Sequence, residues 1–341
     1  MLTRFQSAST VMGLTTVLAF ALLTASSGKL AGAAEPDAKG KKPPAVKGAE
    51  EEEVDLTPQD LALKTDDGLE LHAVYYPGPK LKKSVPVILL HAFKGDSRDF
   101  DDLAKLLQLQ GCAVIVPDLR GHGESKRIVR IGANGDEAKP QTLDAKTLGK
   151  GDFGDMIQYD VETIKQFLLQ RNNEGQLNID RLCLVGAEMG AGVAINYASH
   201  DWSVPALLTG KQGQDVKALV LISPDRNFKG LAIGHAIDDP NIQMQLSIMI
   251  VAGKGNSKAS EAAKQMHKKF ERFHQAPSPE EVAEKKDLFL ITPATSLQGT
   301  QLLTEKSLKL PQQIAQFIQL RLVNSKKAAS WPWAVRKDPN E

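Results

Sequence analysis

Short, uninterrupted apolar runs alternate along this chain with longer segments in which apolar residues recur every three or four positions. A short apolar run bounded by turn residues predicts a fully buried strand, and the helical spacing predicts a helix that packs one face on the sheet. The runs are residues 85–90, 112–117, 181–186, 216–223, 246–252 and 287–291, and the helical segments are residues 100–110, 157–168, 259–273, 314–322 and one that begins at Met189.

The order of these elements predicts the fold class. Strands that alternate with helices form a mostly parallel sheet with helices on both faces. Ahead of them, residues 61–65 and 69–76 are joined by Asp66-Asp67-Gly68, which predicts an antiparallel hairpin. We therefore expect an α/β protein with a doubly wound, mostly parallel sheet and an antiparallel hairpin at its N-terminal edge.

The segment Gly186-Ala187-Glu188-Met189-Gly190 lies between a predicted strand and a predicted helix. Small residues two positions before and after a central residue are typical of the nucleophile elbow, a sharp turn that lifts the central side chain above the sheet. The central position here holds Glu188, where a hydrolase of this architecture carries serine. The turn is therefore expected without its usual nucleophile.

Together with two further segments, the elbow resembles the α/β-hydrolase superfamily, in its lipase and serine-aminopeptidase branch, over residues 58–323. The two segments are the oxyanion-loop-like His91-Ala92-Phe93-Lys94-Gly95 and the turn Asp118-Leu119-Arg120-Gly121-His122-Gly123-Glu124, each directly after a predicted strand. The resemblance implies an oxyanion hole formed by the Met189 amide and an amide at Ala92 or Phe93. It also implies a catalytic triad in the chain order nucleophile, acid, base.

The same resemblance identifies the other two triad positions. Gly253-Lys254-Gly255-Asn256 matches the family's Gly-x-x-Asp pattern with Asn256 in place of the acid, and Gln298-Gly299 matches its His-Gly pattern. A glutamine cannot accept and return a proton near neutral pH, and an asparagine carries no charge to stabilise an imidazolium. We therefore expect degenerate triad positions at Glu188, Asn256 and Gln298, and a catalytically inactive pseudoenzyme.

Three interpretations of Glu188 remain open at this stage. The residue has drifted at a position free of selection, or it serves structure or ligand binding, since a carboxylate is favoured at a helix N-terminus beside oxyanion amides. The third is an unusual carboxylate nucleophile. The predicted function is accordingly a pseudoenzyme that binds a small ligand or a protein partner. The alternatives are a hydrolase of small esters or peptides with a non-standard site around Glu188, and a protein-interaction scaffold.

Other side chains point to structural roles. His91 and His122 follow adjacent strands, where we favour a packing role. Cys112 and Cys183 fall on strands that flank the third strand of the family's sheet, too far apart for a disulfide, so we expect free thiols. His200, His235, His267 and His274 show no metal-ligand spacing, and two cysteines are too few for a zinc site. No metal or other cofactor is expected.

The N-terminus predicts export. Arg4 precedes an apolar stretch at residues 11–23, and small residues end at Ala34, as in a signal peptide of residues 1–34 that is cut after Ala34. A secreted or periplasmic protein is expected, with no stable membrane anchor after cleavage. The mature chain has 40 basic and 41 acidic residues once Arg4 and Lys29 are removed from the totals of 42 and 41. A net charge this close to zero gives no indication of nucleic-acid binding, and none is expected.

The rest of the chain divides into three parts. Residues 35–57 mix charges and prolines with little to bury and predict a disordered linker, residues 58–324 form the hydrolase-like domain, and residues 325–341 form a tail. Within the domain, residues 125–153 follow a strand's carboxyl end and are expected as an insertion over the pocket rim. The sequence does not decide whether the tail's Trp331 and Trp333 dock on the domain or on a partner.

Overall fold

The computed structural model describes residues 54–131, 136–206 and 210–336. The predicted signal peptide, the linker as far as residue 53 and the last five residues of the tail lie outside them. Within the described residues, no helix is long and apolar enough to cross a membrane.

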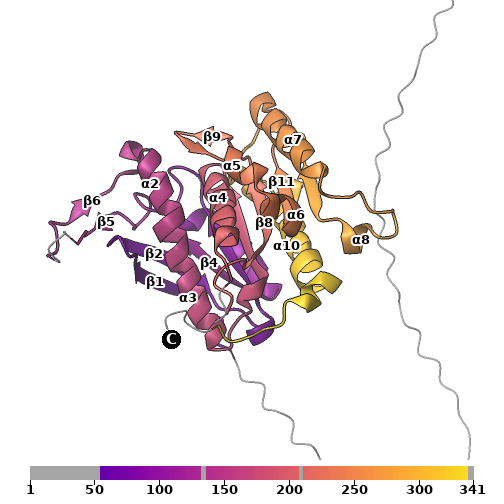
Figure 1. The fold of residues 1–341 in the computed structure, drawn as a ribbon. Helices are drawn as coiled ribbons and strands as arrows, with labels where there is room; N and C mark the ends of the chain where they lie inside the picture. The colour runs from indigo at the N-terminus through magenta and orange to yellow at the C-terminus, as the bar shows by residue number, and fades with distance from the viewer. Residues whose placement is uncertain (1–53, 132–135, 207–209, 337–341) are drawn as a thin grey trace, which may run out of the picture. The chain divides into compact units, whose positions relative to one another are not determined.

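An eight-stranded sheet forms the centre of the described chain (Figure 1). Its order is β1-β2-β4-β3-β7-β8-β11-β12. β1 is antiparallel to β2 and β2 to β4, whereas all other neighbours are parallel. The predicted fold class, including the antiparallel N-terminal edge, is therefore confirmed. The strands are β1 (Gln59–Lys64), β2 (Glu70–Tyr76), β3 (Val85–Leu90), β4 (Cys112–Pro117), β7 (Leu182–Ala187), β8 (Val216–Ile222), β11 (Ser247–Val251) and β12 (Leu288–Ile291).

Helices cover both faces of the sheet, and the period of two in each strand divides the core between them. In β3, Val87 and Leu89 pack on one side, while Ile88 and Leu90 pack on the other. The first side is covered by α1 (Asp101–Leu109) and α10 (Leu310–Ile318), and the second by α3 (Glu162–Asn173), α4 (Met189–Ser203) and α7 (Ser257–Glu271). Burial on both faces explains why the central strands have continuous apolar sequences.

Shorter elements complete the fold. π-helical turns at Met156–Val161 and Gln319–Val323 extend two predicted helices, so residues 157–168 and 314–322 each span a π turn and an α-helix. The described residues of segment 125–153 form a small hairpin, β5 and β6, and the start of a helix, α2. The shorter elements are β5 (Arg127–Ile128), β6 (Gln141–Thr142), α2 (Lys150–Asp155), β9 (Asn227–Phe228), β10 (Leu231–Ala232), α5 (Gly234–Asp238), α6 (Pro240–Gln245), α8 (Val282–Lys285) and α9 (Gln301–Thr304).

The two cysteines are free and buried, as predicted. Cys112 begins β4 and Cys183 lies in β7, on either side of β3. Burial raises the pKa of Cys112 to about 12, which keeps this thiol protonated.

The tail docks on its own domain. Asn178 Nδ2 donates to Trp331 O over 3.0 Å, and Trp333 Nε1 donates to Asn172 O over 3.1 Å. Lys82 Nζ lies 3.9 Å from the centre of the Trp333 ring, a cation–π contact. These contacts place the tail across the amino ends of the central strands.

Candidate functional site

Glu188 occupies a strained turn between β7 and α4. Its backbone has φ 50° and ψ −108°, which confirms the predicted elbow conformation. Its amide donates to Ile222 O over 2.8 Å, and its carbonyl accepts from Ala191 N and Gly192 N. A glutamate in this region is costly unless its surroundings impose it, so the strand before it and the helix after it hold the side chain above the sheet.

Two glycines make this turn possible. A Cβ on Gly186 would lie 2.2 Å from Gly190 O, and a Cβ on Gly190 would lie 2.1 Å from Leu90 O. Both distances are far below any real carbon–oxygen contact, so neither position accepts a side chain while the backbone stays in place. The first turn of α4 therefore touches the carboxyl end of β3, the strand that leads into the segment 91–95.

A cavity of about 260 Å³ opens above the elbow, at the carboxyl edge of the sheet. Glu188, Asn256 and Gln298, which come from three separate loops, all line it. The structure thus brings the three predicted positions together. The other lining residues are Ser223, Pro224, Asp225, Phe228, Lys258, Ala259 and Ala262.

From the convergence of the three positions alone, Gln298 or an oxyanion amide is expected to donate a hydrogen bond to Glu188, but the described residues form no such bond. Gln298 Oε1 accepts from Ser223 Oγ over 2.6 Å, and its Nε2 donates to Gly253 O over 3.0 Å. Asn256 Oδ1 accepts from Ala259 N over 3.1 Å, which caps α7. Both ends of the Gln298 amide are therefore engaged away from Glu188, and the Asn256 oxygen is used by the helix cap.

The Glu188 carboxylate has no hydrogen-bond or ion-pair partner among the residues that the structure describes. Gly299, with φ +56°, approaches it so closely that a Cβ there would lie 2.8 Å from Glu188 Oε1. Burial, and then the nearby Asp225 carboxylate, raise the pKa of Glu188 above its ordinary value. A desolvated carboxylate without a partner is an energetic cost that an added donor would relieve.

An aromatic cluster stands beside the cavity. The Phe93 ring lies 5.1 Å from that of Phe228 and 5.6 Å from that of His122, and Phe153 of α2 contacts Phe228 at 5.7 Å. Thus α2, at the end of segment 125–153, reaches the wall of the cavity.

His91 is a structural residue, in line with the interpretation from the sequence. Leu119 N donates to its Nε2 over 2.9 Å, so the proton is on Nδ1, which donates to Ala92 O over 2.8 Å. Burial lowers the pKa of His91 to about 4. A neutral imidazole with both nitrogens engaged cannot serve as a base here.

Comparison with known proteins identifies the fold family. A family model described as alpha/beta hydrolase fold matches residues 85–287. The chain belongs to the α/β-hydrolase fold family. No curated protein matches the chain at the sequence level.

Solved structures agree on the fold. An esterase from Pyrococcus furiosus, Pf2001, is 14% identical with a TM-score of 0.53, over 78% of this chain and 91% of the esterase. The alpha/beta hydrolase GrgF from Penicillium sp. sh18 is 11% identical with a TM-score of 0.51, over 78% of this chain and 99% of the other. At such low sequence identities, the structural similarity shows that the fold is shared and nothing more.

Four polar or aromatic residues of the cavity were not found from the sequence: Ser223, Asp225, Phe228 and Lys258. Ser223 and Asp225 follow β8, so they carried the same signal as the elbow, namely a position just beyond the carboxyl end of a parallel strand. Phe228 lies in a two-residue strand that no periodicity reveals, and Lys258 is one of many lysines in α7.

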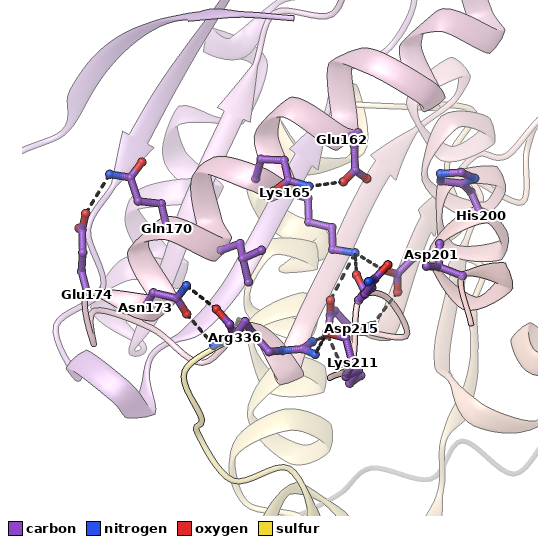
Figure 2. A pocket seen from close by; sticks show the side chains of 14 residues that line it. Glu162, Lys165, Gln170, Asn173, Glu174, His200, Asp201, Lys211, Asp215 and Arg336 are labelled. Carbon is purple, nitrogen blue, oxygen red and sulfur yellow. Dashed lines mark hydrogen bonds and ion pairs between the residues drawn. The ribbon is translucent and has the colours of Figure 1, made fainter. Parts of the chain in front are cut away.

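A larger hollow, of about 680 Å³, lies elsewhere, between α3, the end of α4 and the tail (Figure 2). Its buried charges satisfy one another. Lys165 Nζ lies 2.5 Å from Asp201 Oδ1 and 3.3 Å from Asp215 Oδ2, and Asp215 also pairs with Lys211 and Arg336. Burial alone would raise the pKa of Asp215, but these three cations lower it. This ion-pair network connects α3 and α4 with the tail and has a structural role.

Arg336 is the residue of the tail that takes part in this network. Its Nη1 donates to Lys211 O over 2.6 Å while its Nη2 pairs with buried Asp215. We expect Arg336→Met to lower the free energy of unfolding by about 2 kcal/mol, the size of a charge-assisted hydrogen bond. Urea unfolding measures it. Arg98→Met, which removes an 82% exposed guanidinium paired with Asp96, is the matched control and should cost less than about 1 kcal/mol. Equal effects would refute the role of the tail.

Proposed function

We propose that this α/β-hydrolase-fold chain is an exported pseudoenzyme whose cavity above Glu188 binds a small ligand. The observation that supports it most is the combination of an intact elbow with an open cavity and with no proton relay among the residues that the structure describes. Glu188, Asn256 and Gln298 stand where the family resemblance places nucleophile, acid and base, and all three line the cavity. Export rests on the signal-peptide pattern of residues 1–34.

The contacts of these residues argue against hydrolysis. An acyl ester on Glu188 would need a water activated by a base. Gln298 is bound to Ser223 and Gly253, and a glutamine is not a base. The buried His91 has both ring nitrogens engaged. The proposed oxyanion amides, at Met189 and at Ala92 or Phe93, would then have no acyl transfer to assist.

The cavity favours ligand binding over the scaffold alternative. If the former active site were filled by side chains, the fold would serve only as a platform for partners. Instead, a volume of about 260 Å³ is open above Glu188. Drug-sized pockets measure about 300–1,000 Å³, so a somewhat smaller molecule suits this one.

Measurement of turnover tests the proposal. We expect the mature protein, residues 35–341, to hydrolyse p-nitrophenyl acetate, p-nitrophenyl butyrate and aminoacyl p-nitroanilides no faster than buffer, because attack and proton transfer have both lost their side chains. The Glu188→Gln variant, with the same shape, should give the same background. A wild-type rate above background that this substitution abolishes would refute the proposal and establish a carboxylate nucleophile.

The second candidate is a hydrolase of small esters or peptides with a non-standard site around Glu188. It is favoured by the fact that the structural neighbours include proteins named as esterases, from Pyrococcus furiosus and Pyrobaculum calidifontis. The same assay separates the two candidates.

A further inference from the structure

The cavity above Glu188 has a negative side. Glu188 and Asp225 both line it, and Asp225 is close enough to raise the pKa of Glu188. Asp225 Oδ1 accepts one long hydrogen bond, from Asn227 N at 3.3 Å. Among the described residues neither carboxylate has an ion-pair partner. Two partly buried carboxylates that repel each other are stabilised by a cation placed between them.

A second part of the cavity lining is positive. It is the first turn of α7, a helix of 15 residues, whose Asn256, Lys258 and Ala259 line the cavity. The Asn256 cap satisfies the Ala259 amide, and the helix dipole adds to the charge of Lys258. Lys258 also has no ion-pair partner in the part of the chain that the structure describes. An anionic group is favoured at this end of the cavity.

Other parts of the lining are apolar. They are Pro224, Phe228, Ala259 and Ala262. Phe228 is fixed by ring contacts with Phe93 and Phe153, so its position does not depend on a ligand. An aromatic wall beside carboxylates suits a protonated amine with a short apolar side chain.

We propose that the cavity binds a small zwitterion of the α-amino acid class, its ammonium between Glu188 and Asp225 and its carboxylate near Lys258 and the amino end of α7. The inference rests on the proposed ligand-binding function and names the class of ligand. A simple carboxylic acid would bring a third negative charge to Glu188 and Asp225. A simple amine would leave Lys258 without a counter-charge.

The elbow residue gains a role in this arrangement. The strained turn holds the Glu188 carboxylate above the sheet, and serine at this position would be too short and uncharged to hold an ammonium group. The substitution that removes the nucleophile therefore creates the anionic half of a recognition site.

The test begins with thermal unfolding of the mature protein in the presence of each of the twenty L-α-amino acids. We expect at least one to raise the midpoint, since a ligand that binds only the folded state stabilises it. Calorimetry then compares the strongest binder with its decarboxylated amine and its deaminated acid. Each should bind at least about tenfold more weakly, because each loses one charge-assisted contact of about 1.5–3 kcal/mol.

Substitutions locate the two ends. Glu188→Gln, Asp225→Asn and Lys258→Gln should each weaken the strongest binder about tenfold or more while leaving the unfolding midpoint of the free protein near that of the wild type. Glu280→Gln and Lys264→Gln, at exposed positions outside the cavity lining, are the matched controls and should leave affinity unchanged.

Three results would overturn the assignment: no amino acid raises the midpoint, the amine or the acid binds as tightly as the zwitterion, or the controls weaken binding as much as the cavity variants. Failure of the ligand class is distinguishable from failure of the proposed function, because ester hydrolysis by the same preparation overturns only the absence of turnover.

Discussion

Gly190→Ala should abolish the folded state or lower the free energy of unfolding by about 3 kcal/mol or more, at the upper end of what overpacking costs. The added methyl group would lie 2.1 Å from Leu90 O and 2.6 Å from His91 O. Both are backbone atoms at the carboxyl end of β3, so no rotamer change can relieve the overlap. Relief requires that α4 move away from β3, which would also displace the elbow. The measurement is urea unfolding, or the soluble yield if the variant does not fold.

The control is another helical glycine. A Cβ on Gly154 of α2 would meet no atom within 4 Å. Alanine is favoured over glycine in a helix by about 1 kcal/mol, so Gly154→Ala should leave stability unchanged or raise it slightly. If Gly190→Ala unfolds at the same urea concentration as the wild type, then the close approach of α4 to β3 is wrong, and with it the geometry of the elbow.

Lys165→Met should lower the free energy of unfolding by about 3–5 kcal/mol, the cost of removing one partner of a buried ion pair. Lys165 is almost fully buried, and so are its partners Asp201 and Asp215. Burial alone would lower the pKa of Lys165, but the two carboxylates outweigh it and raise this pKa. Methionine fills a similar volume without the charge, so the effect measured by urea unfolding is electrostatic.

The pH dependence gives this prediction a second readout. The pKa of Asp215 is lowered in the folded state, so its contribution to stability is present above the unfolded value of about 3.9 and is lost as the pH falls through the folded value. Without Lys165, one of the cations that counteract the effect of burial is gone, so the pKa of Asp215 rises. Acid unfolding of the variant should then begin at a higher pH. Lys285→Met breaks an exposed ion pair with Glu281 and serves as the control. It should lower the free energy of unfolding by less than about 1 kcal/mol and leave the pH of acid unfolding unchanged.

The sheet could be predicted from the sequence because its central strands are buried on both faces. Continuous runs such as Val85–Leu90 and Cys112–Pro117 are too short for a typical helix and too apolar for an exposed loop, and both form strands with the predicted bounds. The elbow was equally accessible, since Gly186 and Gly190 mark a close approach of backbones. The π-helical turn Met156–Val161 could not be predicted, because the apolar positions of segment 157–168 keep the three- and four-residue spacing of an ordinary α-helix.

Only some features of the candidate site could be predicted from the sequence. The positions of Glu188, Asn256 and Gln298 after their strands were enough to predict that the three residues line one cavity. The orientation of each side chain depends on competing partners that no motif encodes. Asn256 caps α7 and Gln298 binds the Gly253 backbone, so neither reaches Glu188. Asp225 and Phe228 line the same cavity from segments without a periodic pattern.

The docked tail has a consequence for spectroscopy. All three tryptophans of the chain gather at the amino edge of the sheet: Trp331 and Trp333 in the tail, and Trp202, whose indole donates to Val216 O at the start of β8. The Lys217 ammonium lies 4.6 Å from the Trp202 ring and 5.5 Å from that of Trp331. The cavity at Glu188 lies at the far end of β8, about 20 Å away at 3.3 Å per residue. Intrinsic fluorescence therefore reports release of the tail and is silent to a ligand beside Glu188, so release of the tail can be measured in the presence of a ligand without interference.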